Sequence, residues 1–350
     1  MGYRSPPVLH GRRPCERRRG RPGRRLPDHP DRAPLQWIRD GGRARRQPDR
    51  GGRRDPHPVE PAMSGTRVVI LGASGFVGQA LARALGGDPA LEVVQHSSRT
   101  LDLTRPEALS ALDPVAGPET TLVLASALTP DRGQNLDTLS ANIAMATNVA
   151  RALERLTFGH VVYVGSDAVY GFDVNPVTEA TPVAPAGAYG FGKYAGEKIL
   201  EVVTTPRSVP LLILRVAGVY GPGDPHGSYG PNSFARSIAK DRTVRLFGNG
   251  EEERDHIFVD DVAGLAAALL RARATGVFNL ATGEARSFAD VAKAVRDLVP
   301  YEVTITNLPR KGAITHRRYD IGGLRRAVPD FRFTPFADGL RVTLQGFGAL

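Results

Sequence analysis

A glycine-patterned turn constrains the architecture of this chain most. The segment RVVILGASGFVG, residues 67–78, runs from an aliphatic, strand-like stretch through Gly72, Gly75 and Gly78 into an alanine-rich helical pattern. A turn of this kind between a strand and a helix lets the backbone approach a pyrophosphate, whose charge meets the helix N-terminus. Glycine spacing alone also fits an ordinary strand-to-helix turn, but in this context it predicts a dinucleotide-binding site.

Short β-branched runs alternate with amphipathic helical stretches beyond residue 62. This alternation is typical of βαβ units that build a parallel sheet. We expect strands over 67–72, 92–96, 121–126, 160–166, 211–216 and 277–281, and helices that include 76–86, 133–156 and 187–204. From about Gly221 the pattern loosens into Gly, Pro and Asn-rich connections. The predicted fold class is α/β, a Rossmann doubly wound parallel sheet with a smaller C-terminal substrate-binding lobe.

The composition changes sharply at Met63. Residues 1–62 contain 17 arginines, no lysine and seven acidic residues, and they account for the whole net charge of +10. They show no apolar periodicity, so we expect a disordered basic extension that is not part of the native protein. The alternative is a functional arm that binds nucleic acid or an anionic membrane surface. We assign 63–220 to an NAD(P)-binding Rossmann domain and 221–350 to the substrate-binding lobe, with parts of about 255–281 returning to the Rossmann domain.

The body of the chain, from Met63 onward, excludes several classes of protein. It has no cysteine, because the only one is Cys15, so disulfide scaffolds, thiolate nucleophiles and cysteine-ligated zinc are excluded. Its five histidines are scattered, so we expect no metal site. No run is long and apolar enough to span a membrane. We therefore expect a cytoplasmic protein that binds neither membrane nor nucleic acid.

One segment of the body carries a pair of residues suited to proton transfer. In AYGFGKYAGEK, residues 188–198, Tyr189 and Lys193 are four positions apart, so a helix would place them on one face. A lysine cation beside the phenol would lower its pKa from near 10 and allow it to exchange protons near neutral pH. The spacing is common by itself, and a plain surface helix is the alternative.

Further motifs follow one another in the order of a known family. Beside the glycine turn and the Tyr189–Lys193 pair, they are VYVGSDAVYG (162–171), VYGPGD (219–224), FGNGEEERDHIFVDDVA (247–263) and VFNLATGE (277–284). With these motifs the chain resembles the extended short-chain dehydrogenase/reductase family, of the NAD-dependent epimerase/dehydratase type that acts on nucleotide sugars. The resemblance covers nearly all of residues 65–345.

The resemblance implies a role for each matched catalytic residue. Tyr189 is implied as the acid/base, and Lys193 as the group that lowers its pKa and holds the nicotinamide ribose. Ser166 is implied to hydrogen-bond the reacting oxygen, although a strand-end serine could only satisfy a turn. Asp167 could assist from the same strand end, or it could only cap the following turn.

The resemblance also implies ligand-binding residues. For the cofactor they are Gly72, Ser74, Gly75, Phe76, Val77, Gly78, Ser97, Ser98, Arg99, Asp102, Leu103, Ala125, Ser126, Ala127, Asn142, Tyr189 and Lys193. For the substrate they are Ser166, Asp167, Asn232 and Arg254. Asn142 could instead be a polar helix residue that faces water. Arg254 is implied to bind the diphosphate, and an ordinary surface ion pair is its alternative.

Departures from the family pattern bear on the reaction. The base of the family's dehydratases is replaced by Ala168, which argues against elimination of water. An asparagine that contacts the substrate diphosphate is replaced by Gly218, which leaves the substrate open. After the second expected strand come Ser97, Ser98 and Arg99. NAD enzymes present an acid there, whereas neutral or cationic groups suit the 2′-phosphate of NADP.

We therefore expect an NADPH-dependent 4-ketoreductase that acts on a nucleotide-linked sugar, with NADP preferred and NAD possible. The alternative is a nucleotide-sugar 4-epimerase with retained NAD, because the same three catalytic residues serve both reactions. A dinucleotide-sensing regulator without catalysis is less favoured, since the Ser, Tyr and Lys set is complete. We also expect a homodimer.

Overall fold

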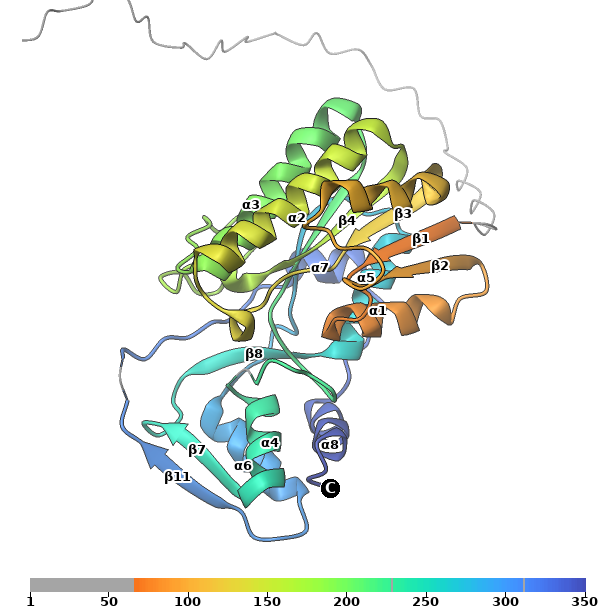
Figure 1. Ribbon diagram of the computed structural model, residues 1–350. Helices are drawn as coiled ribbons and strands as arrows, with labels where there is room; N and C mark the ends of the chain where they lie inside the picture. Colours follow the sequence, from red (N-terminus) through yellow and green to blue (C-terminus); the bar gives the residue numbers. More distant parts are fainter. Residues whose placement is uncertain (1–65, 228, 311) are drawn as a thin grey trace, which may run out of the picture. The chain divides into compact units, whose positions relative to one another are not determined.

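The central sheet of the described chain is parallel throughout. A computed structural model describes residues 66–227, 229–310 and 312–350, so the expected disordered extension and the expected start at Met63 lie outside the described residues. Six strands lie in the order β2-β1-β3-β4-β5-β9 (Figure 1). Their bounds are β1 (Thr66–Leu71), β2 (Leu91–His96), β3 (Gly117–Leu124), β4 (Phe158–Ser166), β5 (Leu211–Val216) and β9 (Gly276–Leu280). This order confirms the predicted Rossmann fold class.

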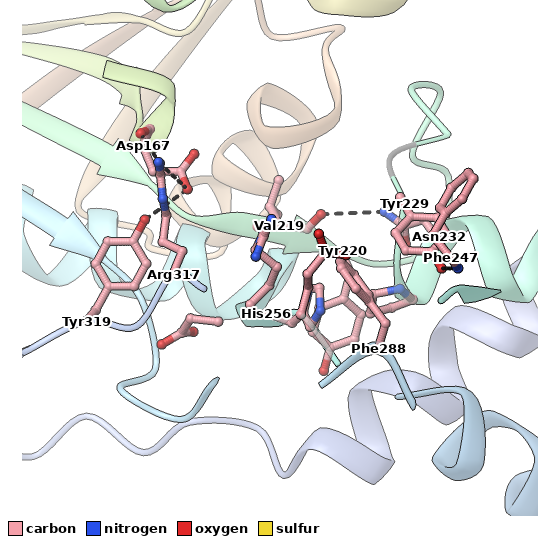
Figure 2. A pocket seen from close by; sticks show the side chains of 15 residues that line it. Asp167, Val219, Tyr220, Tyr229, Asn232, Phe247, His256, Phe288, Arg317 and Tyr319 are labelled. Atoms are coloured by element: carbon pink, nitrogen blue, oxygen red, sulfur yellow. Dashed lines mark hydrogen bonds and ion pairs between the residues drawn. The ribbon is translucent and has the colours of Figure 1, made fainter. Parts of the chain in front are cut away.

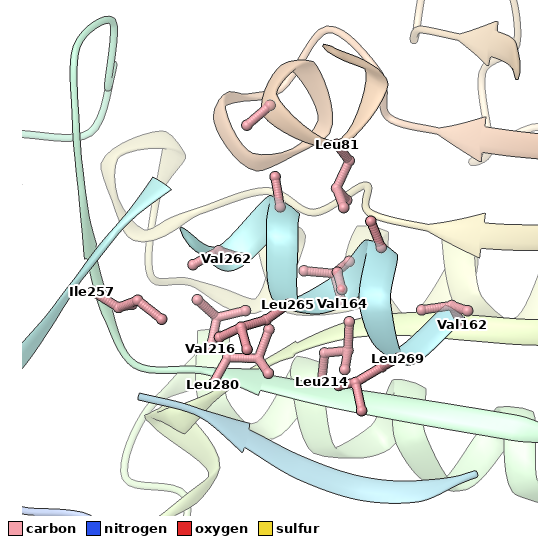
Figure 3. Packing of buried hydrophobic residues seen from close by; sticks show 14 of the residues in the cluster. Leu81, Val162, Val164, Leu214, Val216, Ile257, Val262, Leu265, Leu269 and Leu280 are labelled. Carbon is pink, nitrogen blue, oxygen red and sulfur yellow. The ribbon is translucent and has the colours of Figure 1, made fainter. Parts of the chain in front are cut away.

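Helices cover both faces of this sheet. They are α1 (Phe76–Gly86), α2 (Leu136–Arg155), α3 (Ala188–Thr204), α5 (Val259–Arg271) and α7 (Gly322–Ala327), with 3-10 turns η1 (Pro106–Val115), η2 (Pro130–Arg132), η3 (Asp167–Val169) and η4 (Thr205–Arg207). Val68 and Ile70 pack in the core with α1 and α5, whereas Val69 and Leu71 pack in the core with α2 and α3. Alternate residues of one strand thus enter opposite cores. Figure 3 shows the first core, where Leu265 of α5 packs over the sheet.

The C-terminal lobe has its own small sheets and its own core. Strands β6 (Gly218–Tyr220), β8 (Glu253–Phe258) and β10 (Ala285–Ser287) form a mixed sheet, and β7 (Thr243–Phe247) pairs with β11 (Thr304–Leu308). Helices α4 (Pro231–Asp241), α6 (Phe288–Leu298) and α8 (Phe336–Gly346) contribute Phe234, Val291 and Leu340 to the core. The predicted smaller lobe is therefore present. Within the described ranges, no helix combines the length and the apolar character that a membrane span requires.

The chain returns twice from the lobe to the central sheet. After α5, strand β9 pairs in parallel with β5, with Gly276 opposite Leu212. After β11, the N–H of Val177 donates to the carbonyl of Arg318 at 2.8 Å, and the N–H of Asp320 donates to the carbonyl of Val177 at 3.0 Å. The second return brings a C-terminal segment beside the loop that follows β4. Ligands of α/β sheets bind at this carboxyl edge of the strands.

Candidate active site

The glycine turn has the geometry of a phosphate-binding loop. The N–H groups of Gly72 and Ala73 donate to the carbonyl of His96 at 2.8 and 2.9 Å, which fixes the turn against the end of β2. Gly72 has a φ of +93°, a left-handed value that favours glycine. A Cβ on Gly78 would lie 2.1 Å from the carbonyl oxygen of Gly72. No described side chain caps α1 and its first turn has no acidic residue, so its N-terminal N–H groups suit a phosphate.

Gly78→Ala tests whether this turn depends on close backbone contact. The added Cβ would meet the backbone of Gly72, which cannot move aside as a flexible side chain can. We expect the free energy of unfolding to fall by about 1–3 kcal/mol and dinucleotide affinity to fall by at least about tenfold. Gly86→Ala is the control, since a Cβ there meets nothing within 4 Å. Denaturation and calorimetric titration measure the two effects, and equal behaviour of both variants would contradict the packing argument.

The end of β2 presents a histidine that the sequence analysis did not select. His96 lies 24 positions after the first glycine of the turn, near the position about 20 residues on where dinucleotide folds place a ribose-contacting residue. That spacing was the available signal. Both ring nitrogens of His96 are buried and have no hydrogen-bond partner among the described residues, which fits a bound ribose or phosphate. Beyond it, Ser98 and Arg99 are exposed, and the N–H of Ser97 donates to Thr100 Oγ1 at 2.9 Å.

The other predicted cofactor residues occupy different environments. Asp102 accepts hydrogen bonds from Thr104, and the Leu103 side chain is 4% exposed in the core, so only the Leu103 backbone remains for a ligand. The Asn142 amide exchanges two hydrogen bonds with the backbone of Leu128, at 2.8 and 3.0 Å. Asn142 is buried, so the alternative that it faces water is wrong. The rest lie at the start of α1 (Ser74, Gly75, Phe76, Val77) and directly after β3 (Ala125, Ser126, Ala127).

The three predicted catalytic residues come together at the C-terminal end of β4. Ser166 ends this strand, and its Oγ accepts a hydrogen bond from the N–H of Ala168 at 3.2 Å. Tyr189 lies in the first turn of α3, and the nearby Ser166 side chain acts to lower the pKa of its phenol. Lys193 Nζ lies 5.9 Å from the centroid of the Tyr189 ring and donates to the carbonyl of Val164 at 2.8 Å. One site thus contains a phenol, a hydroxyl and a buried amine.

Burial dominates the protonation of this site. It raises the pKa of Tyr189 to about 12, with the Asp167 charge adding to the rise and the Ser166 side chain opposing it. Lys193 is not among the causes of this shift, so the expected lowering of the phenol pKa by the lysine stays a prediction. Burial also lowers the pKa of Lys193 to about 8, and the Glu197 charge opposes that effect.

A buried ion pair supports the catalytic helix, and the sequence analysis missed it. Arg215 of β5 donates to both carboxylate oxygens of Glu197, at 2.9 and 2.7 Å, and these side chains are 6% and 0% exposed. Arg215 also donates to the Tyr170 hydroxyl at 2.7 Å, which donates to Asn279 Oδ1 at 2.9 Å. The network links α3, β5, β9 and the segment after β4. A lone charge inside the apolar strand LLILRV was the available signal.

Asp167 is engaged by two residues from the far end of the chain. Its Oδ2 accepts a hydrogen bond from the Tyr319 hydroxyl at 2.9 Å and lies 3.4 Å from Arg317 Nη1 (Figure 2). Neither partner was predicted from the sequence, because Arg317 and Tyr319 lie in the polar run THRRYD, which matches no motif. The turn after β4 is capped by the Ser166 side chain, so the alternative that Asp167 only caps it is wrong. Both contacts involve Oδ2, so one of the two carboxylate oxygens of Asp167 is already engaged.

A cavity of about 340 Å³ lies in the C-terminal lobe beside this cluster (Figure 2). The predicted substrate residues Asn232 and Arg254 both line it. Asn232 uses its amide within the lobe, accepting from the N–H of Gly221 at 3.0 Å and donating to Asp224 at 2.8 Å. It therefore shapes the cavity wall, and direct substrate contact stays a prediction. Three aromatic side chains complete that wall, Tyr229, Phe247 and Phe288.

Arg254 is suited to an anionic ligand. It forms no ion pair within the described ranges, so its predicted alternative, an ordinary surface ion pair, is wrong. Its guanidinium donates to the carbonyl of Thr315 at 2.7 Å. Burial lowers the pKa of Arg254, and the Arg317 charge contributes to that lowering. Two buried nitrogen atoms of the cavity wall, His256 Nε2 and Arg317 Nε, have no hydrogen-bond partner among the described residues. Together with the charges of Arg254 and Arg317, they fit a polar, negatively charged ligand.

A second cavity connects residues of the lobe with Tyr189, the predicted acid/base. Its volume is about 280 Å³, and Tyr189 and Gly190 line it. It shares three lining residues with the first cavity, Asp167, Arg254 and Arg317. A ligand held by Arg254 could therefore reach the phenol of Tyr189 past the Asp167–Arg317 pair.

A Rossmann sheet with a glycine turn suited to a phosphate, and with a tyrosine, a serine and a lysine at the end of β4, fits a dinucleotide-dependent class of enzyme. The sequence pattern of the NAD dependent epimerase/dehydratase family matches residues 68–281, and the chain belongs to this family. This confirms the resemblance drawn from the motifs and the prediction of an enzyme. The residues around Gly72 and His96 fit a dinucleotide, as their crowded turn and unpartnered nitrogens indicate.

Two relatives of known name are epimerases. The chain is 28% identical to the UDP-glucose 4-epimerase of Mycolicibacterium smegmatis over 312 residues, 80% of this chain and 98% of that protein. It is 31% identical to the ADP-L-glycero-D-manno-heptose-6-epimerase of Alkalilimnicola ehrlichii over 198 residues, 51% of this chain and 61% of that protein.

Solved structures share the fold over nearly their whole length. RMD of Pseudomonas aeruginosa, complexed with NADPH, has a TM-score of 0.72 at 23% identity, covering 81% of this chain and 99% of that one. The UDP-glucose 4-epimerase of Thermus thermophilus, complexed with NAD, has a TM-score of 0.70 at 23% identity, covering 80% and 98%. At this identity the similarity supports the fold alone.

Proposed function

We propose that this chain is a nucleotide-sugar 4-epimerase. The observation that carries the proposal is the single acid/base group of the site, Tyr189. A dehydratase would need a further base where Ala168 stands, and the neighbouring carboxylate of Asp167 is already engaged. Similarity to a UDP-glucose 4-epimerase over 98% of its length favours this alternative over the ketoreductase expected from the sequence.

One side chain would serve both proton transfers of the reaction. NAD(P), which the glycine turn would hold, would accept the hydride of the 4-carbon, leaving a keto group, and would return it to the opposite face of that carbon. Tyr189 takes the proton of the 4-hydroxyl and later returns a proton to the same oxygen, while Ser166 keeps that oxygen in place. Lys193 holds the ribose, and Arg254 binds the diphosphate. Because the proton taken is the proton returned, no second acid is needed.

An NADPH-dependent 4-ketoreductase is the second candidate. The end of β2 supports it, because His96, Ser97, Ser98 and Arg99 include no carboxylate for the ribose hydroxyls of NAD. The same Tyr189, Ser166 and Lys193 would then protonate a keto oxygen once, in one direction. Cofactor preference therefore bears directly on the choice between the two reactions.

Arg99→Ala is expected to weaken NADPH binding by about tenfold or more, with NADH affinity changed by less than about twofold. A charged hydrogen bond to the 2′-phosphate contributes about 1.5–3 kcal/mol, whereas NADH offers no phosphate there. Arg105→Ala is the control, because that exposed arginine of the same loop pairs with Glu107 at 2.8 Å. Fluorescence titration gives the dissociation constants. If the affinities for NADPH and NADH fell equally, Arg99 would not contact the 2′-phosphate, and the end of β2 would no longer support the reductase.

Two incubations of the purified enzyme separate the candidate reactions. In the first, a nucleotide hexose such as UDP-glucose is supplied without added dinucleotide, and product stereochemistry is followed by NMR. In the second, a nucleotide-linked 4-keto-6-deoxyhexose is supplied with NADPH, and its oxidation is followed by absorbance. Interconversion of 4-epimers without net dinucleotide turnover supports the proposal. Stoichiometric NADPH oxidation, without epimer interconversion, would replace it by the reductase.

A further inference from the structure

Arg317 connects the C-terminal segment to the catalytic strand end through an unusual number of contacts. Its side chain is 5% exposed. Nη2 donates to the carbonyls of Tyr170 and Gly171, at 3.0 and 2.8 Å, and Nη1 donates to the carbonyl of Asp167. The guanidinium also lies 4.1 Å from the centroid of the Phe172 ring. One cation therefore holds the backbone that directly follows Ser166.

The same cation faces the carboxylate nearest to the catalytic phenol. Asp167 Oδ2 lies 3.4 Å from Arg317 Nη1 and accepts a hydrogen bond from the Tyr319 hydroxyl at 2.9 Å, and Figure 2 shows both side chains pointing toward Asp167. The Asp167 side chain is 25% exposed, so water screens it only partly. Without the Arg317 cation beside it, the negative charge of Asp167 would be less offset and would raise the pKa of Tyr189 further.

We propose that Arg317 is a positioning residue of the catalytic centre, which holds the backbone after Ser166 and balances the Asp167 carboxylate beside Tyr189. For turnover this inference rests on the acid/base role of Tyr189 in the proposed function. The Asp167 charge raises the pKa of Tyr189, in the same direction as burial does. Balancing that charge keeps the phenol closer to the pH at which it can exchange protons.

The groups that face Tyr189 come from every element packed around it. Ser166 and Asp167 come from the end of β4, and Lys193 comes from the same helix as Tyr189. Tyr163 of β4 is the other phenol that interacts electrostatically with Tyr189. Arg254 and Arg317 come from the lobe and line the same cavity as Tyr189. Asp167 carries the negative charge among these groups. Removing its partner, the Arg317 cation, should therefore raise the pKa of Tyr189.

Arg317→Met removes the charge and keeps a chain of similar length. We expect the pKa of Tyr189 to rise, which lowers the phenolate fraction at every pH below it. Because this pKa is already about 12 in the protein without cofactor, the titration is followed on protein saturated with NAD⁺, whose nicotinamide cation favours the phenolate. Tyrosinate absorbance is recorded as the difference between each variant and the same variant carrying Tyr189→Phe. Arg317→Lys keeps the charge but loses the bidentate geometry, so the pKa of Tyr189 in this variant should lie close to that in the unchanged protein.

A double variant separates charge balance from structure. Asp167→Asn in the Arg317→Met background removes the unbalanced anion, so the Tyr189 titration should return to its original position or below. If Arg317→Met leaves the titration unchanged, or if Asp167→Asn does not reverse its shift, the inference is overturned. Tyr319→Phe, which removes one hydrogen bond to the same carboxylate, provides a milder variant with a smaller upward shift should Arg317→Met fold poorly.

The titration needs no substrate, so it stays readable if the enzyme proves not to be an epimerase. Where turnover can be measured, the pH profile of kcat/KM should move upward in Arg317→Met and return in the double variant. In Arg317→Met, kcat at neutral pH should fall. Arg317 also lines the cavity, so the movement of the pH profile, and not KM, is the deciding readout. A raised KM with an unmoved pH profile would show ordinary substrate binding by Arg317 and would overturn the inference.

Discussion

Tyr189→Phe is expected to lower turnover by about 10²–10⁴-fold, with dinucleotide affinity nearly unchanged. The phenol is the group at the site that can take and return the proton of a sugar hydroxyl, and phenylalanine keeps its ring but not its oxygen. The ring contact with Lys193, at 5.9 Å from Nζ to centroid, should persist. Epimerisation rate and calorimetric titration with NAD(P) measure the two quantities.

Tyr194→Phe is the matched control on the same helix. The Tyr194 ring faces the exposed Lys198, with Nζ 5.4 Å from its centroid, and lies outside the proposed catalytic set. Its loss of a hydroxyl should change turnover by less than about twofold. Comparable losses in both variants would show that α3 tolerates no change, and the proton-transfer role of Tyr189 would lose its support.

Glu197→Gln is expected to lower the free energy of unfolding by about 3–5 kcal/mol, because it leaves the Arg215 cation buried without its carboxylate. Both side chains are almost fully buried, at 0% and 6% exposure. The same change removes the charge that opposes the effect of burial on Lys193, so the lysine pKa should fall below about 8. Chemical denaturation gives the free energy, and dinucleotide affinity above neutral pH reports the lost lysine charge.

The control for this variant is Glu201→Gln, one helical turn further along α3. Glu201 pairs with Lys198 at 2.8 Å, but these side chains are 37% and 49% exposed. Solvent screens such a pair, so its loss should cost less than about 0.5 kcal/mol. If both substitutions cost the same, burial would not be the source of the stabilisation.

The sequence predicted those parts of the protein that depend on local pattern. The strand and helix around Gly72 follow from the change of period from two to 3.6 and from the glycine spacing. Tyr189 and Lys193 followed from their separation by one helical turn, which α3 realises. Asn142 and Arg254 were found by resemblance; the structure contradicts their non-functional alternatives, and their ligand-binding roles stay predictions. The homodimer stays a prediction.

What the sequence did not predict depends on contacts between distant segments. Arg317 and Tyr319 lie about 150 positions from Asp167, and no local pattern brings them there. The direction of the Tyr189 pKa depends on the density of protein around the phenol, which residue spacing does not give. The close approach of α3 to the end of β4 is a further such contact, because a Cβ on Gly190 would lie 2.3 Å from the carbonyl oxygen of Ala168.

The pairing of β9 with β5 has a consequence for how the protein is made. Residues 211–216 leave the ribosome about sixty positions before their neighbours at 276–280, which pair with them in the finished sheet. Until then β5 presents an open row of N–H and C=O groups, the kind of edge on which other chains assemble. The part of the lobe that contains α4, β7 and β8 must therefore be synthesised while the nascent sheet is still open. A chain cut short before β9 would keep that edge exposed and would be prone to aggregate.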